Sequence, residues 1–301
     1  MIRLYEVGPR DGLQGLSKII SVEDRVKMVS LLHDAGIDSI EVGSMVNPNR
    51  LPTMANSAEV YETLSEMHPD ARYSLLVMNE RGMRDALQAG VRNFNIVLSP
   101  VQRFNHHNLG KDMHDSMMMY EEMLKDIPRH NVRAYVSCAF TELNPGESIA
   151  ECLSWANMIA STVVLADTDG TVDTMSLADS IRLSRTLGID NLALHFHLSH
   201  ARPQTHIDTF LSLAYAMGVK EFDSSIAGLG GCPYVDGSGS NLSTEVLISW
   251  ALKNGHDIGD INLRSLTRAS RFVRNAVSDR RRFFPVTSWA EARILMKSIW
   301  P

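Results

Sequence analysis

Residues 163–197 read VVLADTDGTVDTMSLADSIRLSRTLGIDNLALHFH, and this stretch contains one complete strand–helix–strand unit. The apolar run Val163–Ala166 indicates a strand, and Leu192–His197 indicates the next one. A helix is expected between them near Met175–Leu187, with Gly188 behind it as the residue that ends the helix. Because the helix serves as the crossover between the two strands, the strands are expected to pair in parallel.

The same unit recurs on both sides of this stretch. One helix has a clear start, because Ser21 is followed three residues later by Asp24, which resembles a capping box with Asp in place of Glu. The other predicted strands are Ile2–Val7, Ile37–Val42, Tyr73–Val77, Asn93–Leu98, Val132–Ser137 and Lys220–Asp223, and further helices are expected near residues 53–66, 80–89, 113–125, 148–160, 204–217 and 242–253.

The number of units favours a closed barrel. A (β/α)₈ TIM barrel typically needs about 250 residues, and the chain has 301. We therefore predict an α/β fold in which a TIM barrel covers about residues 1–255. Additional C-terminal helical segments are expected over about 260–301, within a single domain over 1–301. An open doubly wound sheet is the competing architecture.

Composition and charge exclude several classes of partner. The formal net charge of −6 provides no field that would attract nucleic acid or an anionic membrane. No run approaches 18 apolar residues, and the N-terminus has no cationic head followed by a long apolar stretch. The three cysteines form no C-x-x-C pair, which indicates reduced thiols. These features predict a cytoplasmic protein without nucleic-acid or membrane partners.

Polar side chains follow the predicted strands at the points where the strands end. In a TIM barrel the loops after the strands surround the mouth, so reactive groups gather there. We expect these residues to converge on one rim: Arg10 and Asp11 after the first strand, Glu41 and Ser44 at the second, Ser99 after the fourth, Cys138 after the fifth, Asp167, Thr168 and Asp169 after the sixth, His195 and His197 in the seventh, and Cys232 and Asn241 after the eighth.

The His-x-His pair of the seventh strand is the sharpest signal. Residues i and i+2 of a strand point to the same face, so His195 and His197 can reach one metal ion. Asp11 and Asn241 would complete a mixed nitrogen and oxygen donor set that suits Mg²⁺, Mn²⁺, Co²⁺ or Zn²⁺. The alternatives are two ordinary strand histidines, and a helix-capping role for Asn241 in the turn Ser238–Asn241.

Three further residues carry possible chemistry. Arg10 is permanently charged and suits a developing enolate oxygen; a structural ion pair with Glu41 or Asp167 is the alternative, and the two roles can coexist. Asp167 is a base or an orienting group, or else it caps the turn Thr168–Gly170. Cys232 lies in a glycine-rich loop, where it either transfers a proton as the loop closes or is a small buried residue.

Two segments resemble a known family. Val7–Gln14, VGPRDGLQ, and Ser225–Tyr234, SIAGLGGCPY, resemble the two signatures of 3-hydroxy-3-methylglutaryl-CoA lyase, and the similarity runs from about residue 2 to 277. That family belongs to the metallolyase barrels, which share an Arg-Asp-Gly first loop and a His-x-His seventh strand. The second signature is the more specific, because the wider superfamily lacks it.

The resemblance implies a retro-Claisen cleavage of a 3-hydroxyacyl-CoA, expected to be 3-hydroxy-3-methylglutaryl-CoA or a close analogue, to acetyl-CoA and acetoacetate or its counterpart. It implies that a bound Mg²⁺ or Mn²⁺ contacts the substrate, that an arginine stabilises the enolate, that a cysteine protonates it, and that the protein is a homodimer. The predicted metal ligands are Asp11, His195, His197 and Asn241; the predicted catalytic residues are Arg10, Asp11, Glu41, Asp167, His195 and Cys232; the predicted substrate contacts are Arg10, Gln14, Ser44, Thr168 and Arg202.

Two departures from the family pattern bear on the substrate. The family continues after His-x-His with Asp-Thr-Tyr-Gly, whereas this chain has Leu198–Arg202, LSHAR. Arg202 is therefore a candidate contact for an additional or displaced anionic group, with a solvent-facing arginine as the alternative. His106 and His107 replace lysines on the CoA side, where Arg103 and Lys111 are possible substitutes.

Three other functions compete with the lyase. One is an acyl-CoA condensing synthase of the same superfamily, which would carry a long C-terminal extension. Another is an aldolase for a 4-hydroxy-2-oxo acid, which would not need the Cys232 loop. The third is a non-catalytic metal-binding accessory protein, which the altered stretch Leu198–Arg202 favours.

Overall fold

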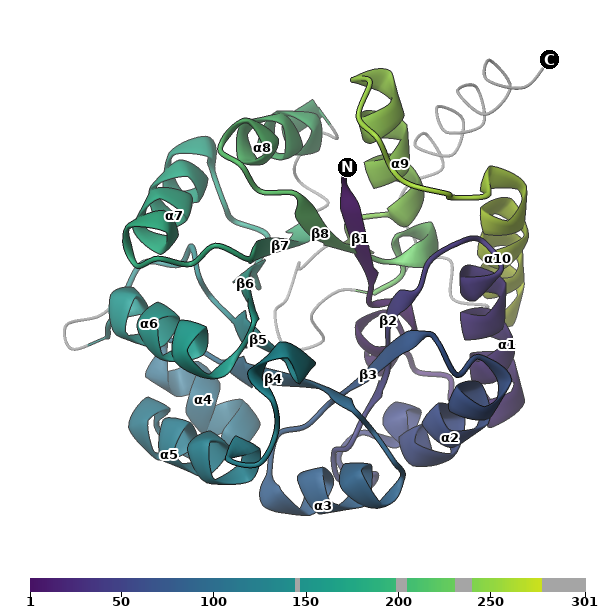
Figure 1. The fold of residues 1–301 in the computed structure, drawn as a ribbon, viewed down its shortest axis with the longest axis horizontal. Coiled ribbons are helices and arrows are strands. Elements are labelled where there is room, and N and C mark those ends of the chain that lie inside the picture. Colours follow the sequence, from purple (N-terminus) through teal and green to yellow (C-terminus); the bar gives the residue numbers. More distant parts are fainter. Residues whose placement is uncertain (144–146, 199–204, 231–239, 278–301) are drawn as a thin grey trace.

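The computed structural model describes residues 1–143, 147–198, 205–230 and 240–277. Eight parallel strands form a closed barrel, because each strand pairs with the next along the chain and β8 pairs with β1 (Figure 1). This arrangement confirms the predicted TIM barrel. The strands are β1 (Arg3–Glu6), β2 (Ser39–Ser44), β3 (Arg72–Leu76), β4 (Asn93–Leu98), β5 (Val132–Val136), β6 (Thr162–Asp167), β7 (Leu192–Leu198) and β8 (Glu221–Ser224), and a short β9 (Ser240–Asn241) pairs antiparallel with β7.

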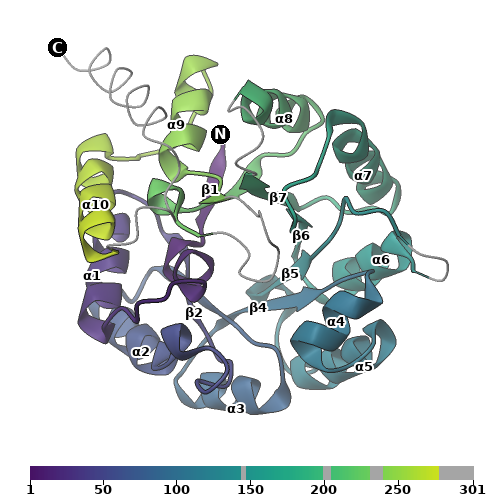
Figure 2. The same ribbon diagram turned by 180° about the vertical axis from the view of Figure 1, so that it is seen from behind.

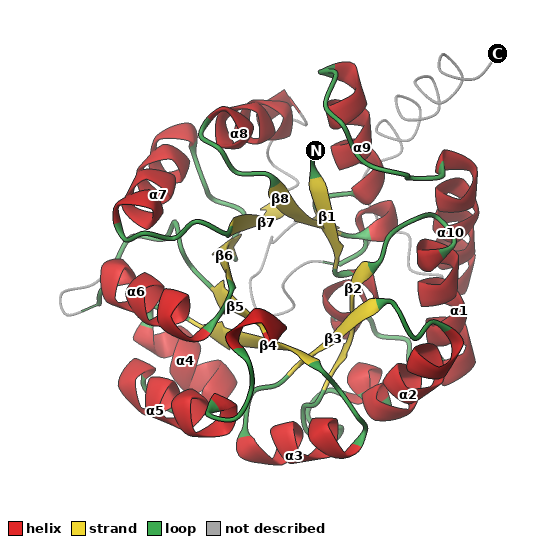
Figure 3. Cartoon of the chain, viewed as in Figure 1, coloured by secondary structure: helices red, strands yellow, loops and turns green. Residues whose placement is uncertain are grey.

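A ring of helices surrounds the strands (Figure 3). No helix within the described ranges is both long enough and apolar enough to span a membrane. The helices are α1 (Val22–His33), α2 (Ser57–Met67), α3 (Glu80–Gln88), α4 (Gln102–Leu109), α5 (Met113–Leu124), α6 (Ile149–Ile159), α7 (Thr174–Thr186), α8 (Thr205–Ala216), α9 (Thr244–Lys253) and α10 (Leu263–Ala276).

Local sequence signals explain where several helices begin and end. The Ser21 hydroxyl accepts a hydrogen bond from the Asp24 amide at 3.1 Å, so Ser21 caps α1 as predicted. Gly188 follows α7 with a φ of +74°, a conformation that glycine adopts without strain. Helix α4 was not predicted. It gives the segment between β4 and β5 two helices instead of one.

The C-terminal region adds α10 outside the eight units. Figures 1 and 2 show α10 beside α1 from opposite sides, and the two helices are in contact. This confirms the first of the two predicted C-terminal helical segments. The second falls within residues 278–301, which lie outside the described residues.

The inside of the barrel holds buried polar groups beside a small apolar cluster of Tyr135, Val164 and Ala193, whereas the outward faces of the strands form the main apolar core with the helices. In β5, Val132, Ala134 and Val136 belong to that core, and the alternate residues Arg133 and Tyr135 make hydrogen bonds inside the barrel. Strand alternation places successive side chains on opposite faces, so one strand serves both environments. The buried polar groups are therefore available to support the rim above them.

Candidate metal and active site

The turn after β1 carries Arg10 and Asp11 into the mouth of the barrel. Residues Gly8–Gly12 form a single π-helical turn, in which both side chains are buried. Gly8 has no room for a side chain, because an added Cβ would lie 2.6 Å from Glu6 Oε1. A compact turn of this kind is frequent at functional sites, where it redirects side chains inward.

His195 and His197 face each other from alternate positions of β7. Their Nε2 atoms are 3.1 Å apart. His195 Nδ1 is 3.1 Å from Asp223 Oδ2, and His197 Nδ1 is 2.8 Å from the Thr168 carbonyl oxygen. A carbonyl or carboxylate oxygen only accepts, so both Nδ1 atoms donate and carry the hydrogen. In the neutral rings, two Nε2 lone pairs therefore point at one another.

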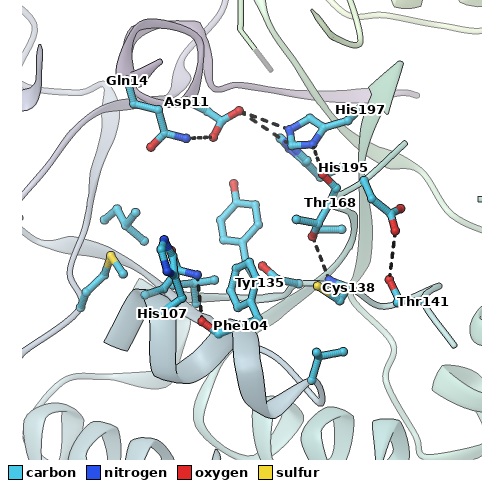
Figure 4. Close-up of a pocket in the computed structure, with 18 of the residues that line it drawn as sticks. Asp11, Gln14, Phe104, His107, Tyr135, Cys138, Thr141, Thr168, His195 and His197 are labelled. Atoms are coloured by element: carbon cyan, nitrogen blue, oxygen red, sulfur yellow. Dashed lines mark hydrogen bonds and ion pairs between the residues drawn. The ribbon is translucent and has the colours of Figure 1, made fainter. Parts of the chain in front are cut away.

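Asp11 adds a carboxylate to the two imidazoles. Its Oδ2 atom lies 3.9 Å from His195 Nε2 and 3.6 Å from His197 Nε2 (Figure 4). These three residues form the one such cluster of His, Cys, Asp and Glu that the described part of the chain contains. Two facing lone pairs and a carboxylate repel unless a proton or a metal cation lies between them, and two nitrogens with one oxygen are a donor set that fits a divalent metal ion.

Asn241 supplies a fourth polar group at the same place. The register of β7 with β9 sets Asn241 opposite His197, and its Nδ2 donates to Asp11 Oδ2 at 2.8 Å and to the Leu229 carbonyl at 3.1 Å. Its Oδ1 atom is buried without a hydrogen-bond partner. An orphaned buried oxygen beside the donor cluster fits a metal ligand. Ser243, and not Asn241, occupies the N-cap position of α9, and the Asn241 side chain makes its hydrogen bonds to Asp11 and Leu229 instead.

Arg10 is held by two carboxylates. Its Nε donates to Glu41 Oε2 at 2.6 Å, and its Nη1 donates to Asp11 Oδ1 at 2.7 Å. Gln14 Nε2 donates to the same Asp11 oxygen at 2.7 Å. Burial opposes the charge on Arg10, but Glu41 and Asp11 outweigh it and hold the pKa of Arg10 above its ordinary value. Burial would likewise raise the pKa of Asp11, but Arg10 and the imidazoles hold that pKa well below its usual range. Arg10 and Asp11 are therefore a fixed cation and a fixed anion.

Asp167 organises the loop after β6. Its Oδ1 accepts hydrogen bonds from the Thr171 amide at 3.0 Å and the Val172 amide at 3.2 Å. Burial raises the pKa of Asp167 to about 7. These contacts match the capping alternative for this residue. Arg10 makes its ion pairs with Asp11 and Glu41; no ion pair with Asp167 is present in the described part of the chain.

Ser44 and Thr168 differ in what they face. The Ser44 hydroxyl donates to the Leu76 carbonyl on the neighbouring strand at 3.4 Å. Thr168 lines the cavity at the mouth, and its Oγ1 accepts from the Cys138 amide at 2.8 Å (Figure 4). Two other predicted site residues, Cys232 and Arg202, lie outside the described residues.

A cavity of about 600 Å³ opens from the donor cluster (Figure 4). One end is polar and contains Arg10, Asp11, Gln14, His195 and His197. Apolar groups and residues of α4 form other parts of the wall. They include Leu76, Met78, Val97, Val101, Arg103, Phe104 and His107.

Sequence reasoning missed Asp223 as a partner of His195, together with the buried Arg133 that pairs with Asp223. It also missed Thr141, which lines the cavity together with Asp169, a residue that was predicted at the rim. The available signal for Arg133 was a charged residue inside an otherwise apolar strand, β5. Such residues are almost never fully buried unless they are paired.

The fold and the site define a TIM-barrel protein with two imidazoles, a carboxylate and a buried arginine at the mouth of the barrel. The sequence model of the HMGL-like family matches residues 1–273. A match of that extent covers the barrel and most of α10. The chain belongs to the HMGL-like family.

Individual relatives agree with this assignment. The 3-hydroxy-3-isohexenylglutaryl-CoA/hydroxymethylglutaryl-CoA lyase of Pseudomonas aeruginosa is 34% identical over 267 residues, which cover 85% of this chain and 86% of the relative. A crystal structure of hydroxymethylglutaryl-CoA lyase from the same organism has a TM-score of 0.85 at 29% identity, covering 99% of this chain and 98% of that one. A lyase from Acinetobacter baumannii, in complex with coenzyme A and 3-methylmalate, has a TM-score of 0.82 at 26% identity and covers 92% of each chain.

Proposed function

We propose that this protein is a divalent-metal-dependent lyase that cleaves the C2–C3 bond of a 3-hydroxyacyl-CoA. The expected reaction converts 3-hydroxy-3-methylglutaryl-CoA, or a close analogue, to acetyl-CoA and acetoacetate or its counterpart. One observation carries the proposal: a fixed cation, Arg10, lies beside two facing imidazole lone pairs and the Asp11 carboxylate at the mouth of a cavity. The names of the relatives support the substrate class.

Asp11, His195, His197 and Asn241 would hold the metal ion. The nitrogen and oxygen donors suit Mg²⁺ or Mn²⁺, with Co²⁺ and Zn²⁺ also possible. When bound, the ion would act as a Lewis acid that lowers the pKa of the substrate 3-hydroxyl group.

Arg10 would stabilise the negative charge that develops on the thioester enolate when the C2–C3 bond breaks. A base takes the 3-hydroxyl proton as the new carbonyl of acetoacetate or its counterpart forms, the C2–C3 electron pair passes to the thioester enolate, and a proton added at C2 gives acetyl-CoA. Among the described residues, Arg10 Nη2 has no hydrogen-bond partner, so its two N–H groups remain to meet the enolate oxygen. A preorganised donor of this kind costs no reorganisation during the reaction. We assign the final proton transfer to Cys232.

The other predicted site residues would orient the reacting groups, contact the substrate or shape the rim. Glu41 would fix the direction of the Arg10 side chain, and Asp167 would fix the loop that presents Thr168. Gln14 and Thr168 line the cavity and would contact the substrate. Ser44, whose hydroxyl is directed to a backbone carbonyl, would shape the rim without a polar contact to the substrate.

The substituent at C3 is the open part of the substrate. Apolar residues such as Val97 and Phe104 line the cavity, and one relative is named for an isohexenyl as well as a methyl substrate. Arg202 remains our candidate for an additional anionic contact, and Arg103 lies at the cavity wall where the CoA moiety would enter. Comparing the wild type with Arg202→Ala over a substrate panel tests the first idea, since equal turnover on every substrate would end it.

The decisive experiment detects products by mass spectrometry. The chelator-treated protein is incubated with a panel of 3-hydroxyacyl-CoAs, with and without Mg²⁺ or Mn²⁺. Metal-dependent acetyl-CoA release supports the lyase. Condensation of acetyl-CoA with an oxo acid would indicate a synthase, cleavage of a 4-hydroxy-2-oxo acid would indicate an aldolase, and metal binding without turnover would indicate an accessory protein.

We also propose a single domain over residues 1–301, a cytoplasmic location and a homodimer. Cys138 and Cys152 are free thiols, which suits a reducing compartment. The dimer rests on the family resemblance. Light scattering during size-exclusion chromatography measures the mass of the assembly, and a monomeric mass would reject the dimer.

A further inference from the structure

Asp223 binds the imidazole of His195 from inside the barrel. It lies on β8 inside the barrel, with 1% of its surface exposed. Its Oδ2 accepts hydrogen bonds from His195 Nδ1 at 3.1 Å and from the Tyr135 hydroxyl at 2.8 Å. A carboxylate that accepts from Nδ1–H fixes the tautomer and the orientation of the ring. The Nε2 lone pair of His195 is thereby directed toward Asp11 and His197.

Arg133 provides the counter-charge for Asp223. Its Nη2 donates to Asp223 Oδ1, and its Nη1 donates to Glu221 Oε1. The guanidinium carbon lies 4.0 Å from the ring centroid of Tyr5, and the residue is 6% exposed. A carboxylate buried to this depth is strongly destabilised when its cation is removed. Arg133 therefore balances the charge of Asp223 inside the barrel and fixes the position of its carboxylate.

Arg133 approaches from the end of the barrel opposite the mouth. It lines a separate cavity of about 310 Å³ together with residues at the starts of strands, among them Arg3, Arg72 and Glu221. Within the described part of the chain, it is not among the residues that line the cavity at the mouth. Arg133 therefore has no route to the substrate, and its influence on the site must pass through Asp223 and His195.

We propose that Arg133 and Asp223 are positioning residues of the metal site, and that their ion pair holds His195 with Nε2 aimed at Asp11 and His197. This inference rests on the proposed function only in requiring that the rim bind a divalent cation. The contacts that run from Arg133 through Asp223 to His195 link the two ends of the barrel. It makes metal affinity depend on a residue that lies outside the substrate cavity.

The test measures Mn²⁺ binding to the full-length protein by electron paramagnetic resonance of the free ion, without substrate. Asp223→Asn and Arg133→Met should raise the Kd for Mn²⁺ roughly 10- to 100-fold, as loss of an orienting partner does elsewhere. Arg133→Lys keeps the charge and should recover part of the affinity. Glu221→Gln is the matched control, because it removes the other ion pair of Arg133 and leaves Asp223 paired. Its Kd should stay close to that of the wild type.

Kinetics separate positioning from a structural role. At saturating Mn²⁺ the variants should regain turnover, with an unchanged KM for the acyl-CoA, because neither residue contacts substrate. A purely structural role would lower the Tm without moving the Kd for Mn²⁺. If Arg133→Met fails to fold, Asp223→Asn and Arg133→Lys decide the question.

The outcomes distinguish the two proposals. A wild type that binds Mn²⁺ but cleaves no acyl-CoA ends the lyase function and leaves the positioning pair in place. Folded Asp223→Asn and Arg133→Met variants with the Kd of the wild type overturn the positioning pair and leave the lyase standing. A wild type that binds no Mn²⁺ overturns both.

Discussion

Gly230→Ala should disturb the metal site by pushing on Asn241. An added Cβ would lie 2.6 Å from Asn241 Nδ2 and 2.9 Å from Gly12 Cα. An ordinary contact is about 3.5 Å, so the amide must move by about 0.9 Å. Metal–ligand distances tolerate only about 0.2 Å. Asn241 Oδ1, which is buried without a partner, would then no longer reach the ion.

We expect the Kd for Mn²⁺ to rise at least roughly 10- to 100-fold in this variant, because loss of a group that merely supports a ligand already weakens metal binding by that factor. Isothermal titration calorimetry with Mn²⁺ measures the effect. Gly230 also has a φ of +114°, so an alanine there strains the backbone. Gly90→Ala is the control, because Gly90 has a φ of +74° with nothing within 4 Å of the added Cβ. Equal Kd values for Gly230→Ala and the wild type would refute Asn241 as a ligand.

Three other perturbations have defined outcomes. Arg10→Lys keeps a charge but loses the fork that binds Glu41 and Asp11, so kcat/KM should fall by about 10²–10³; steady-state kinetics that match the wild type would exclude Arg10 from catalysis. Burial raises the pKa of Glu6 to about 8. The protonated carboxyl group therefore stabilises the fold fully at pH values below its unfolded-state pKa of 4.5, and this contribution is lost as the pH rises through 8. Urea unfolding of Glu6→Gln should therefore show a shallower fall of stability over that window, by up to about 1.4 kcal/mol per pH unit, and an identical slope would show that Glu6 does not titrate there. Gly43→Ala would place a Cβ 2.4 Å from Ser57 Oγ and should destabilise the fold by about 1–3 kcal/mol; an unchanged Tm would mean that the neighbours yield freely.

The periodic spacing of apolar and polar residues was sufficient to predict the barrel and the pairing of the two imidazoles. Strand β4 was predicted at its observed bounds, Asn93–Leu98, because an apolar run between turn signals marks it. His195 and His197 were predicted to share a face because side chains in a strand alternate, and their Nε2 atoms are indeed 3.1 Å apart. The convergence of Asp11 with them followed from the barrel topology, which brings the strand ends together.

Other features depend on contacts that a sequence does not display. Helix α4, QRFNHHNL, has few apolar residues and lies within a connection that was expected to hold one helix. Asp167 stays a candidate base, and the hydrogen bonds that its Oδ1 accepts from two backbone amides could not be predicted from the sequence. Arg133 and Asp223 lie 90 residues apart, and only the closed barrel makes them partners. Pairing of this kind arises from tertiary structure rather than from local pattern.

The hydrogen bond from Asn241 to Asp11 joins residues 230 positions apart in the chain. During synthesis on the ribosome, the Asp11 carboxylate would therefore be made long before the Asn241 amide. Nascent or truncated copies that end before β9 would lack the full donor set and compete poorly for scarce cellular metal. With the proposed ligand set, ion capture would fall at the end of biosynthesis, and metal binding would favour completed molecules over fragments.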